Sequence, residues 1–139
     1  KLARVVELFK QSEQVYFVGD MRELECFYSL QLDLMCKGQA VYHCNFDEVE
    51  KDELPTMNEK TVVCIFSVSD QYYPEERQML FQEAKRCHAQ TVWFTQEGED
   101  ADAELTYRYG CAGSRTEGYY SLLLLEKVMS AMLYRSDNA

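Results

Sequence analysis

The stretch TVVCIFSVSDQYYPEERQ, residues 61–78, decides the fold of this chain. It opens with a continuous apolar run, residues 62–66, which is short and rich in β-branched and aromatic side chains. Such a run predicts a strand buried on both faces, as in the middle of a parallel sheet. A polar turn with Ser67 and Ser69 follows, and Pro74 with two glutamates behind it predicts the start of a helix.

This turn is a candidate ligand site. In open α/β sheets, ligands bind where a buried strand leads through a turn into the N-terminus of a helix, and anionic ligands are favoured there. The alternative is that both serines only shape the turn.

Strands and helices alternate along the rest of the chain. Further strands are predicted at residues 14–19, 40–44, 90–95 and 105–109, and helices at residues 2–12, 21–35, 46–54, 74–88 and 119–135. Gly38 follows the second helix, where glycine readily takes the left-handed conformation of a helix cap. The alternation predicts one α/β domain, residues 1–135, built as a three-layer sandwich around a parallel sheet, with a tail at residues 136–139.

Composition limits what this chain can do. With 139 residues it is long enough for one domain with a packed core and too short for two ordinary domains. The formal net charge of −10 and the lack of a basic stripe argue against nucleic-acid binding by this segment itself. No apolar run approaches the roughly 20 residues that a membrane-spanning helix needs. The chain starts with Lys1 rather than Met, and we expect a segment to precede it.

Six cysteines are scattered along the chain without a C-x-x-C pair: Cys26, Cys36, Cys44, Cys64, Cys87 and Cys111. In a domain of this size, such spacing predicts reduced, packed thiols and a cytoplasmic location rather than a disulfide framework. His43–Cys44 and Cys87–His88 are adjacent pairs, and neighbouring residues of a strand point to opposite faces of the sheet. We therefore predict no metal site, and we predict no cofactor.

Several catalytic and nucleotide-binding motifs are missing. The turn after the first predicted strand, residues 19–23, has only the first glycine of G-x-G-x-x-G. Neither the phosphate-binding loop G-x-x-x-x-G-K-[ST] nor the nucleophile elbow G-x-S-x-G occurs. Cysteines and histidines are available for a catalytic pair, but nothing in the sequence positions one, so no catalytic residue is predicted.

The order of the elements and two motifs resemble the sugar isomerase (SIS) domain over nearly the whole chain. The first motif, residues 67–69, matches S-x-S, and the second, AKRCHAQTVWFT at residues 84–95, matches the family's helix-to-strand segment. The chain looks most like the SIS domain in the C-terminal half of RpiR-type bacterial transcriptional regulators. This resemblance implies a five-stranded sheet in the order 2-1-3-4-5, a phosphosugar-sensing module that forms homodimers, and DNA binding by an upstream helix-turn-helix domain.

Three turns hold the candidate ligand-binding residues: those after the first and third strands, and the one before the last helix. The candidates are Gly19, Arg22, Glu23, Ser67, Ser69, Gln71, Tyr72, Ser114 and Arg115. Arg115 is the best anion binder in the third turn, because a guanidinium can donate two parallel hydrogen bonds to one anion.

Departures from the family pattern alter the predicted pocket. Met21 and Glu23 stand where the family has its second glycine and its phosphate-binding serine, and Asp70 and Tyr72 replace a glycine and a threonine. Carboxylates at both Glu23 and Asp70 would repel a phosphate dianion in a partly desolvated cleft, unless Arg22 swings in. Three interpretations stay open: a neutral or amine-bearing ligand, a weakly bound phosphosugar, or a vestigial site in a dimerisation scaffold.

The sequence thus predicts the carbohydrate-sensing and dimerisation domain of an RpiR-like regulator, with a degenerate phosphate site. The alternatives are a SIS-type sugar phosphate isomerase or binding protein, and a dimerisation scaffold without a ligand. An isomerase needs a base aimed at a substrate carbon. His43, His88 and Glu117 are the candidates, but we expect surface, core-edge and helix N-terminal roles for them.

The last predicted helix is apolar over more than one stripe, and we expect it to pack on the sheet and on a second subunit. Four tyrosines flank the candidate turns: Tyr72, Tyr73, Tyr119 and Tyr120. Because tyrosine packs while keeping a polar tip, these side chains are predicted to line a pocket or the dimer interface.

Overall fold

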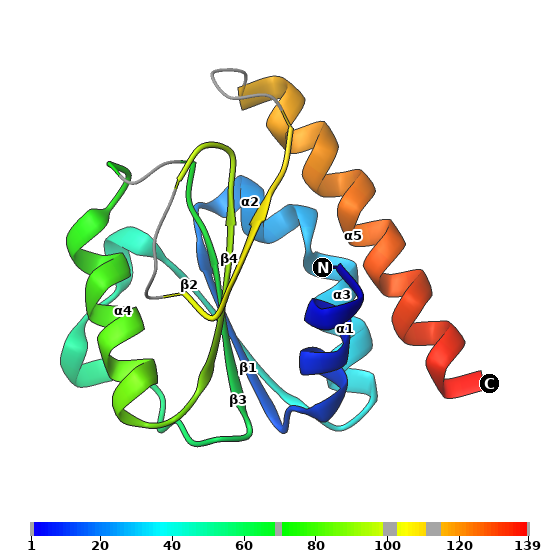
Figure 1. Ribbon diagram of the computed structural model, residues 1–139, viewed down its shortest axis with the longest axis horizontal. Helices are drawn as coiled ribbons and strands as arrows, with labels where there is room; N and C mark the ends of the chain where they lie inside the picture. Colours follow the sequence, from blue (N-terminus) through cyan, green and yellow to red (C-terminus); the bar gives the residue numbers. More distant parts are fainter. Residues whose placement is uncertain (1, 69–70, 99–102, 111–114, 139) are drawn as a thin grey trace.

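The computed structural model describes residues 2–68, 71–98, 103–110 and 115–138, and these residues form a three-layer α/β/α sandwich (Figure 1). The sheet has five parallel strands in the order β2-β1-β3-β4-β5, so the predicted fold class and strand order are confirmed. The strands are β1 (Gln14–Gly19), β2 (Ala40–Asn45), β3 (Thr61–Phe66), β4 (Gln90–Thr95) and β5 (Leu105–Arg108). Each strand lies within one residue of its predicted bounds.

Helices cover both faces of the sheet (Figure 1). One face carries α4 (Pro74–Arg86), and the other carries α1 (Leu2–Gln11), α2 (Met21–Cys26), α3 (Tyr28–Cys36) and α5 (Arg115–Asn138). The long helix α5 lies across α1, α2 and α3. It starts four residues before the predicted Tyr119 and runs three residues past the predicted Arg135, so residues 136–138 continue the helix.

The central strand β3 is buried along its whole length, as its apolar run predicts. Its side chains alternate between two cores. On the α2 and α5 side, Phe66 stacks on Phe94 and Phe17, at ring-centroid distances of 5.1 and 6.4 Å. On the α4 side, Ile65 packs with Trp93 and Val63. The strand β3 is therefore a central strand that is covered on both faces. Its carboxyl end lies at the edge of the sheet where ligands bind in such folds.

The helix predicted at residues 21–35 is two helices, because the chain bends at Phe27. This residue has φ −104° and ψ 14°, and its side chain is fully buried. The bend brings its ring to 4.7 Å from the Phe66 ring and 5.5 Å from the Phe94 ring. Gly38 ends α3 with φ 90°, as predicted, and its N–H donates to the carbonyl of Met35.

The prediction of a helix at residues 46–54 is wrong. The segment forms two single 3₁₀ turns, Phe46–Glu48 and Lys51–Glu53, separated by extended backbone. Carboxylates fall three or four residues apart along this stretch, and like charges at that spacing destabilise an α-helix. As a result, this crossover covers the β2 end of the sheet less completely than α4 covers its centre.

Two compositional expectations can be compared with the structure. Within the described ranges, five cysteines are free thiols, and the sixth, Cys111, lies outside those ranges. No helix in the described part of the chain has the length and apolarity that crossing a membrane would require.

Candidate ligand cleft

The carboxyl ends of the strands meet α2 and α5 at a cleft that is almost completely filled. A cavity of about 10 Å³ remains there, lined by Glu23, Val68, Gln96, Tyr109, Gly118 and Tyr119. This is at most the space for one water molecule. The position agrees with the general rule for open α/β sheets, and the space that the described residues leave there is smaller than a sugar.

Glu23 closes the cleft from α2. Its side chain is only 1% exposed, although carboxylates are seldom fully buried unless they are paired. Glu23 Oε1 accepts a hydrogen bond from the backbone N–H of Asp20 at 3.2 Å, and Asp20 Oδ1 accepts one from the Glu23 N–H at 2.9 Å. This reciprocal pair is a capping box, which explains why the turn after β1 starts a helix without further glycines.

Tyr109 holds the other carboxylate oxygen. Its hydroxyl donates to Glu23 Oε2 at 3.1 Å, which ties the end of β5 to α2 across the cleft. Burial raises the pKa of Tyr109 well above its usual value, and the neighbouring Glu23 charge raises that pKa further. Tyr109 therefore stays a neutral donor at physiological pH.

Gly118 closes the cleft from α5. A Cβ atom at this position would lie 2.6 Å from Nε2 and 2.9 Å from Cδ of Gln96, so only glycine fits without moving that side chain. Gln96 is itself 5% exposed. Contact between α5 and the residue after β4 thus fills the space beside the Glu23 carboxylate.

Among the described residues, the predicted ligand-binding side chains do not share one surface. Ser67 is fully buried, and its Oγ accepts a hydrogen bond from the indole Nε1 of Trp93 at 2.7 Å, in the core on the α4 side. Tyr72 is half-buried on that same side, with its ring against Phe46 and Tyr73. Glu23, in contrast, lies on the α5 side.

The remaining described candidates are not among the residues that line the cavity. Gly19 ends β1, and a Cβ there would lie 3.1 Å from Phe66 Cβ, so the glycine permits close approach of β1 and β3. Arg22 is exposed, with its guanidinium 5.7 Å from the centre of the Tyr119 ring. Gln71 is exposed at the start of the segment that leads into α4.

Ser69, Asp70 and Ser114 lie outside the described residues, as does the side chain of Arg115. Their role in ligand binding stays a prediction.

The structure also adds residues that the sequence analysis missed: Gln96, Tyr109 and Gly118. Gln96 and Tyr109 directly follow β4 and β5, and the carboxyl ends of parallel strands lie at one edge of the sheet. Position after a strand was therefore a usable signal for both. No sequence signal pointed to Gly118, because its role depends on how α5 docks.

A much larger hollow lies elsewhere, on the α4 side beside β2. It measures about 830 Å³ and is floored by Gln14, Tyr16, Tyr42 and Cys44. Its wall carries the exposed carboxylates of Asp47, Glu48, Glu50 and Glu53. The hollow exists because two 3₁₀ turns, rather than a helix, cross this part of the sheet. We refer to it below as the acidic hollow.

The candidate isomerase bases are dispersed. His43 on β2 lies 3.2 Å from Gln31 Oε1 through its Nδ1, and Glu117 is exposed in the first turn of α5. His88, with φ 62°, precedes β4 and so lies at the amino edge of the sheet, opposite the cleft. None of the three lines the 10 Å³ cavity.

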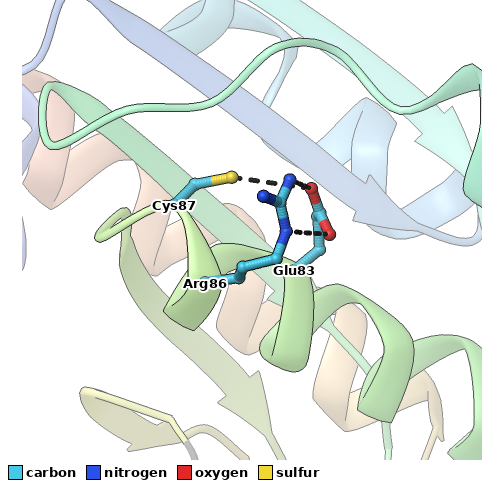
Figure 2. A network of polar contacts seen from close by, with 3 residues as sticks. All are labelled: Glu83, Arg86 and Cys87. Atoms are coloured by element: carbon cyan, nitrogen blue, oxygen red, sulfur yellow. Dashed lines mark hydrogen bonds and ion pairs between the residues drawn. The ribbon is translucent and has the colours of Figure 1, made fainter.

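The adjacent pair Cys87–His88 shows no sign of nucleophile activation. The Cys87 thiol donates to Glu83 Oε1 at 3.5 Å, and the same carboxylate pairs with Arg86 (Figure 2). Desolvation and the hydrogen bond to Glu83 raise the pKa of Cys87, whereas a reactive cysteine needs a lowered pKa. In the described residues, no group of three or more metal-ligating side chains is arranged around a common point.

Comparison with known proteins agrees with this geometry at the level of the fold. Neither a protein-family model nor a curated protein sequence matches the chain. Solved structures do match. One is a Methanococcus jannaschii protein whose structure led to an inferred 3-hexulose-6-phosphate isomerase function, with a TM-score of 0.77 and 14% identity over 99% of this chain and 77% of that one.

Two regulators match as well. The sugar isomerase domain of an RpiR transcription factor from Sphaerobacter thermophilus has a TM-score of 0.68 and 14% identity, over 95% of this chain and 75% of that one. The chain has the fold of a sugar isomerase domain. The NanR protein of Vibrio vulnificus, solved with ManNAc-6P, has a TM-score of 0.70 and 17% identity over 97% of this chain and 53% of that one.

Proposed function

We propose that this SIS-fold chain is the regulatory domain of an RpiR-like transcriptional regulator, that it joins subunits, and that it does not isomerise sugars. The observation that carries the proposal is the Glu23 carboxylate, which is buried in the ligand cleft and bonded to Tyr109 and to the Asp20 N–H. An isomerase has to admit its substrate to a base. Here the described polar groups Glu23, Asp20 and Tyr109 are bonded to one another, and the described residues leave about 10 Å³ between them.

The chain is similar in fold both to a regulator domain and to an inferred isomerase. The choice between a regulatory and a catalytic function therefore depends on the residues of the cleft. A degenerate phosphate site fits a regulator, because a regulator can keep its subunit contacts after its ligand site has changed. In such a protein, DNA binding would come from a separate helix-turn-helix domain. The sensing of a phosphosugar by this chain stays a prediction.

The surface proposed to join subunits is the outer side of α5. Large apolar residues recur there at helical spacing, with Tyr120 69% and Leu124 67% exposed, and with Val128 and Tyr134 exposed further along. The opposite side of α5 already covers α1, α2 and α3. An exposed apolar stripe of this kind marks a protein contact, and a second copy of the chain would bury it.

Sedimentation equilibrium tests the proposal. The wild-type chain is expected to be a dimer at micromolar concentration, and Leu124→Glu is expected to be a monomer, because a carboxylate in an apolar interface cannot be desolvated cheaply. Lys85→Glu is the control, since it adds a carboxylate at an exposed site on α4, in the opposite layer. A monomeric wild type at 100 μM, or conversion of any sugar phosphate above background, would contradict the proposal.

A further inference from the structure

The strand β2 forms one edge of the sheet, and within the described residues it pairs with β1 alone. The backbone groups on the free side of such a strand are a template for one more strand. Proteins often protect an edge with Lys, Asp, Glu or Pro, but the sequence of β2, AVYHCN, contains none of these. At the opposite edge, β5 is shorter and ends at Arg108, whose guanidinium donates to the Gly98 carbonyl at 3.0 Å. The edge at β2 is thus the less protected of the two.

A pocket lies on each side of β2. Tyr42 and Cys44 belong to the floor of the acidic hollow, on the α4 side. On the α2 and α3 side, His43 and Asn45 line a second pocket of about 230 Å³. Alternate residues of a strand point to opposite faces of a sheet. A strand added beside β2 would therefore place every second side chain over the acidic hollow and the others over the second pocket.

The second pocket is mainly apolar and already formed. Met21 and Tyr28 line it and are 63% and 56% exposed, and Leu24 lies beside them. Its polar residues are held in place: Gln31 Nε2 donates to the Leu24 carbonyl at 3.2 Å, and Gln31 Oε1 lies 3.2 Å from His43 Nδ1. A pocket that is held in this way loses little freedom when it takes up an apolar side chain. We refer to it as the apolar pocket.

The acidic hollow favours the opposite chemistry. The carboxylates of Asp47, Glu48, Glu50 and Glu53 line it, and all four residues are exposed. A lysine or arginine side chain that enters the hollow would be attracted to several carboxylates at once, whereas an acidic side chain would be repelled. The charge of the hollow and the apolarity of the other pocket together specify what an added strand has to carry.

We propose that the free edge of β2 binds an extended segment of a partner protein in which lysine or arginine alternates with large apolar residues. The segment adds a further strand to the sheet, with its cationic side chains in the acidic hollow and its apolar side chains toward the apolar pocket. Main-chain hydrogen bonds supply affinity, and the two pockets supply specificity. The inference goes beyond the proposed function and does not rest on it, because the proposed subunit contact lies on α5.

The backbone amide signals of residues 41–44, followed by NMR during titration with a synthetic peptide, test the inference. The probe alternates lysine and valine over six residues, the length of β2. It is expected to shift these signals and to slow hydrogen exchange at the amides of the free edge, because strand addition bonds them. A block peptide, with all its valines before all its lysines, has the same charge and composition. It is expected to bind about tenfold more weakly, because it cannot serve both pockets.

Charge reversal separates the hollow from the charge of the whole domain. Glu50→Lys is expected to weaken binding of the alternating peptide about tenfold, because it places a cation in the acidic hollow. Glu104→Lys is the matched control, since Glu104 is an exposed carboxylate directly before β5, at the opposite edge of the sheet. It changes the net charge equally and is expected to bind like the wild type. Tyr28→Ser removes part of the apolar pocket and is expected to weaken binding about threefold.

Three results would overturn the inference. The first is an alternating peptide that binds the wild type no better than the block peptide does. The second is binding that leaves hydrogen exchange at residues 41–44 unchanged. The third is equal weakening by Glu50→Lys and Glu104→Lys, which would assign binding to long-range attraction alone. Sedimentation measures the subunit contact through α5 separately, so failure of this inference is distinguishable from failure of the proposed function.

Discussion

The filled cleft and the acidic hollow differ in what their polar groups are bonded to. In the cleft, Glu23, Tyr109 and Asp20 satisfy one another, and about 10 Å³ is left. In the acidic hollow, about 830 Å³ is open, and the carboxylates on its wall are exposed. Volume alone would direct attention to the hollow, whereas strand topology directs it to the cleft. The comparison teaches that the place where the fold favours ligand binding and the place where the described residues leave most space can differ.

The largest effect is expected at Ser67, which belongs to the S-x-S turn but is buried and hydrogen-bonded in the core. Replacing Ser67 by alanine leaves the buried indole N–H of Trp93 without its acceptor, and an unsatisfied buried donor costs about 1–3 kcal/mol of unfolding free energy. Urea denaturation measures this loss. Ser29→Ala, at an exposed serine of α3, is the matched control, with an expected change within about 0.5 kcal/mol.

The same loss should shrink when Trp93 is first replaced by phenylalanine, because phenylalanine has no N–H to satisfy. The cycle of single and double variants isolates the hydrogen bond from the effect of each change alone. If Ser67→Ala lowers the free energy of unfolding by less than about 0.5 kcal/mol in the wild-type background, the hydrogen bond to Trp93 contributes little to stability. A role of Ser67 in ligand binding would then regain support.

Most of the fold was predictable from sequence because its signals are local. Neighbouring residues alone determine the apolar runs of β1, β3 and β4. The same holds for the helix end at Gly38 and the helix start at Pro74. The break at Phe27 was not predictable in this way. It depends on a ring that inserts between Phe66 and Phe94, residues far away in the chain.

The position of the candidate cleft was predictable from the sequence, whereas the contacts that fill it were not. Its location follows from where strands end, and Glu23 stood out as a carboxylate at a phosphate-binding position of the family that the chain resembles. The hydrogen bond from Tyr109 to the buried Glu23 was not predictable, because it is a tertiary contact between the end of β5 and α2. The burial of Ser67 depends likewise on the path of Trp93 across the sheet.

Cys26 gives the next contrast, through the pH dependence of stability. Burial raises its pKa from 9.0 to about 11, and the charge of Glu23 adds to the shift. Above about pH 9 the unfolded chain loses this thiol proton while the folded chain keeps it, so stability falls as pH rises. Between pH 8 and pH 10 the expected loss from this group is about 1 kcal/mol.

Urea denaturation at both pH values measures that loss. Cys26→Ala should reduce the difference between pH 8 and pH 10, and Cys36→Ala, at an exposed thiol of the same helical layer, should leave it unchanged. Equal slopes for the two variants would mean that the cleft side of α2 is more open to water than its geometry indicates.

The carboxylates of the acidic hollow should give the smallest effect. Glu50→Gln and Glu53→Gln remove exposed charges that make no capping or core contact, so each change is expected to stay within about 0.5 kcal/mol in unfolding free energy. A small gain is the expected sign, because like charges crowd this segment, and added salt should reduce the gain by screening. A loss of unfolding free energy above about 1 kcal/mol would show that these carboxylates make stabilising hydrogen bonds or ion pairs, as Glu23 does. The cleft and the acidic hollow would then no longer differ in how their carboxylates are bonded.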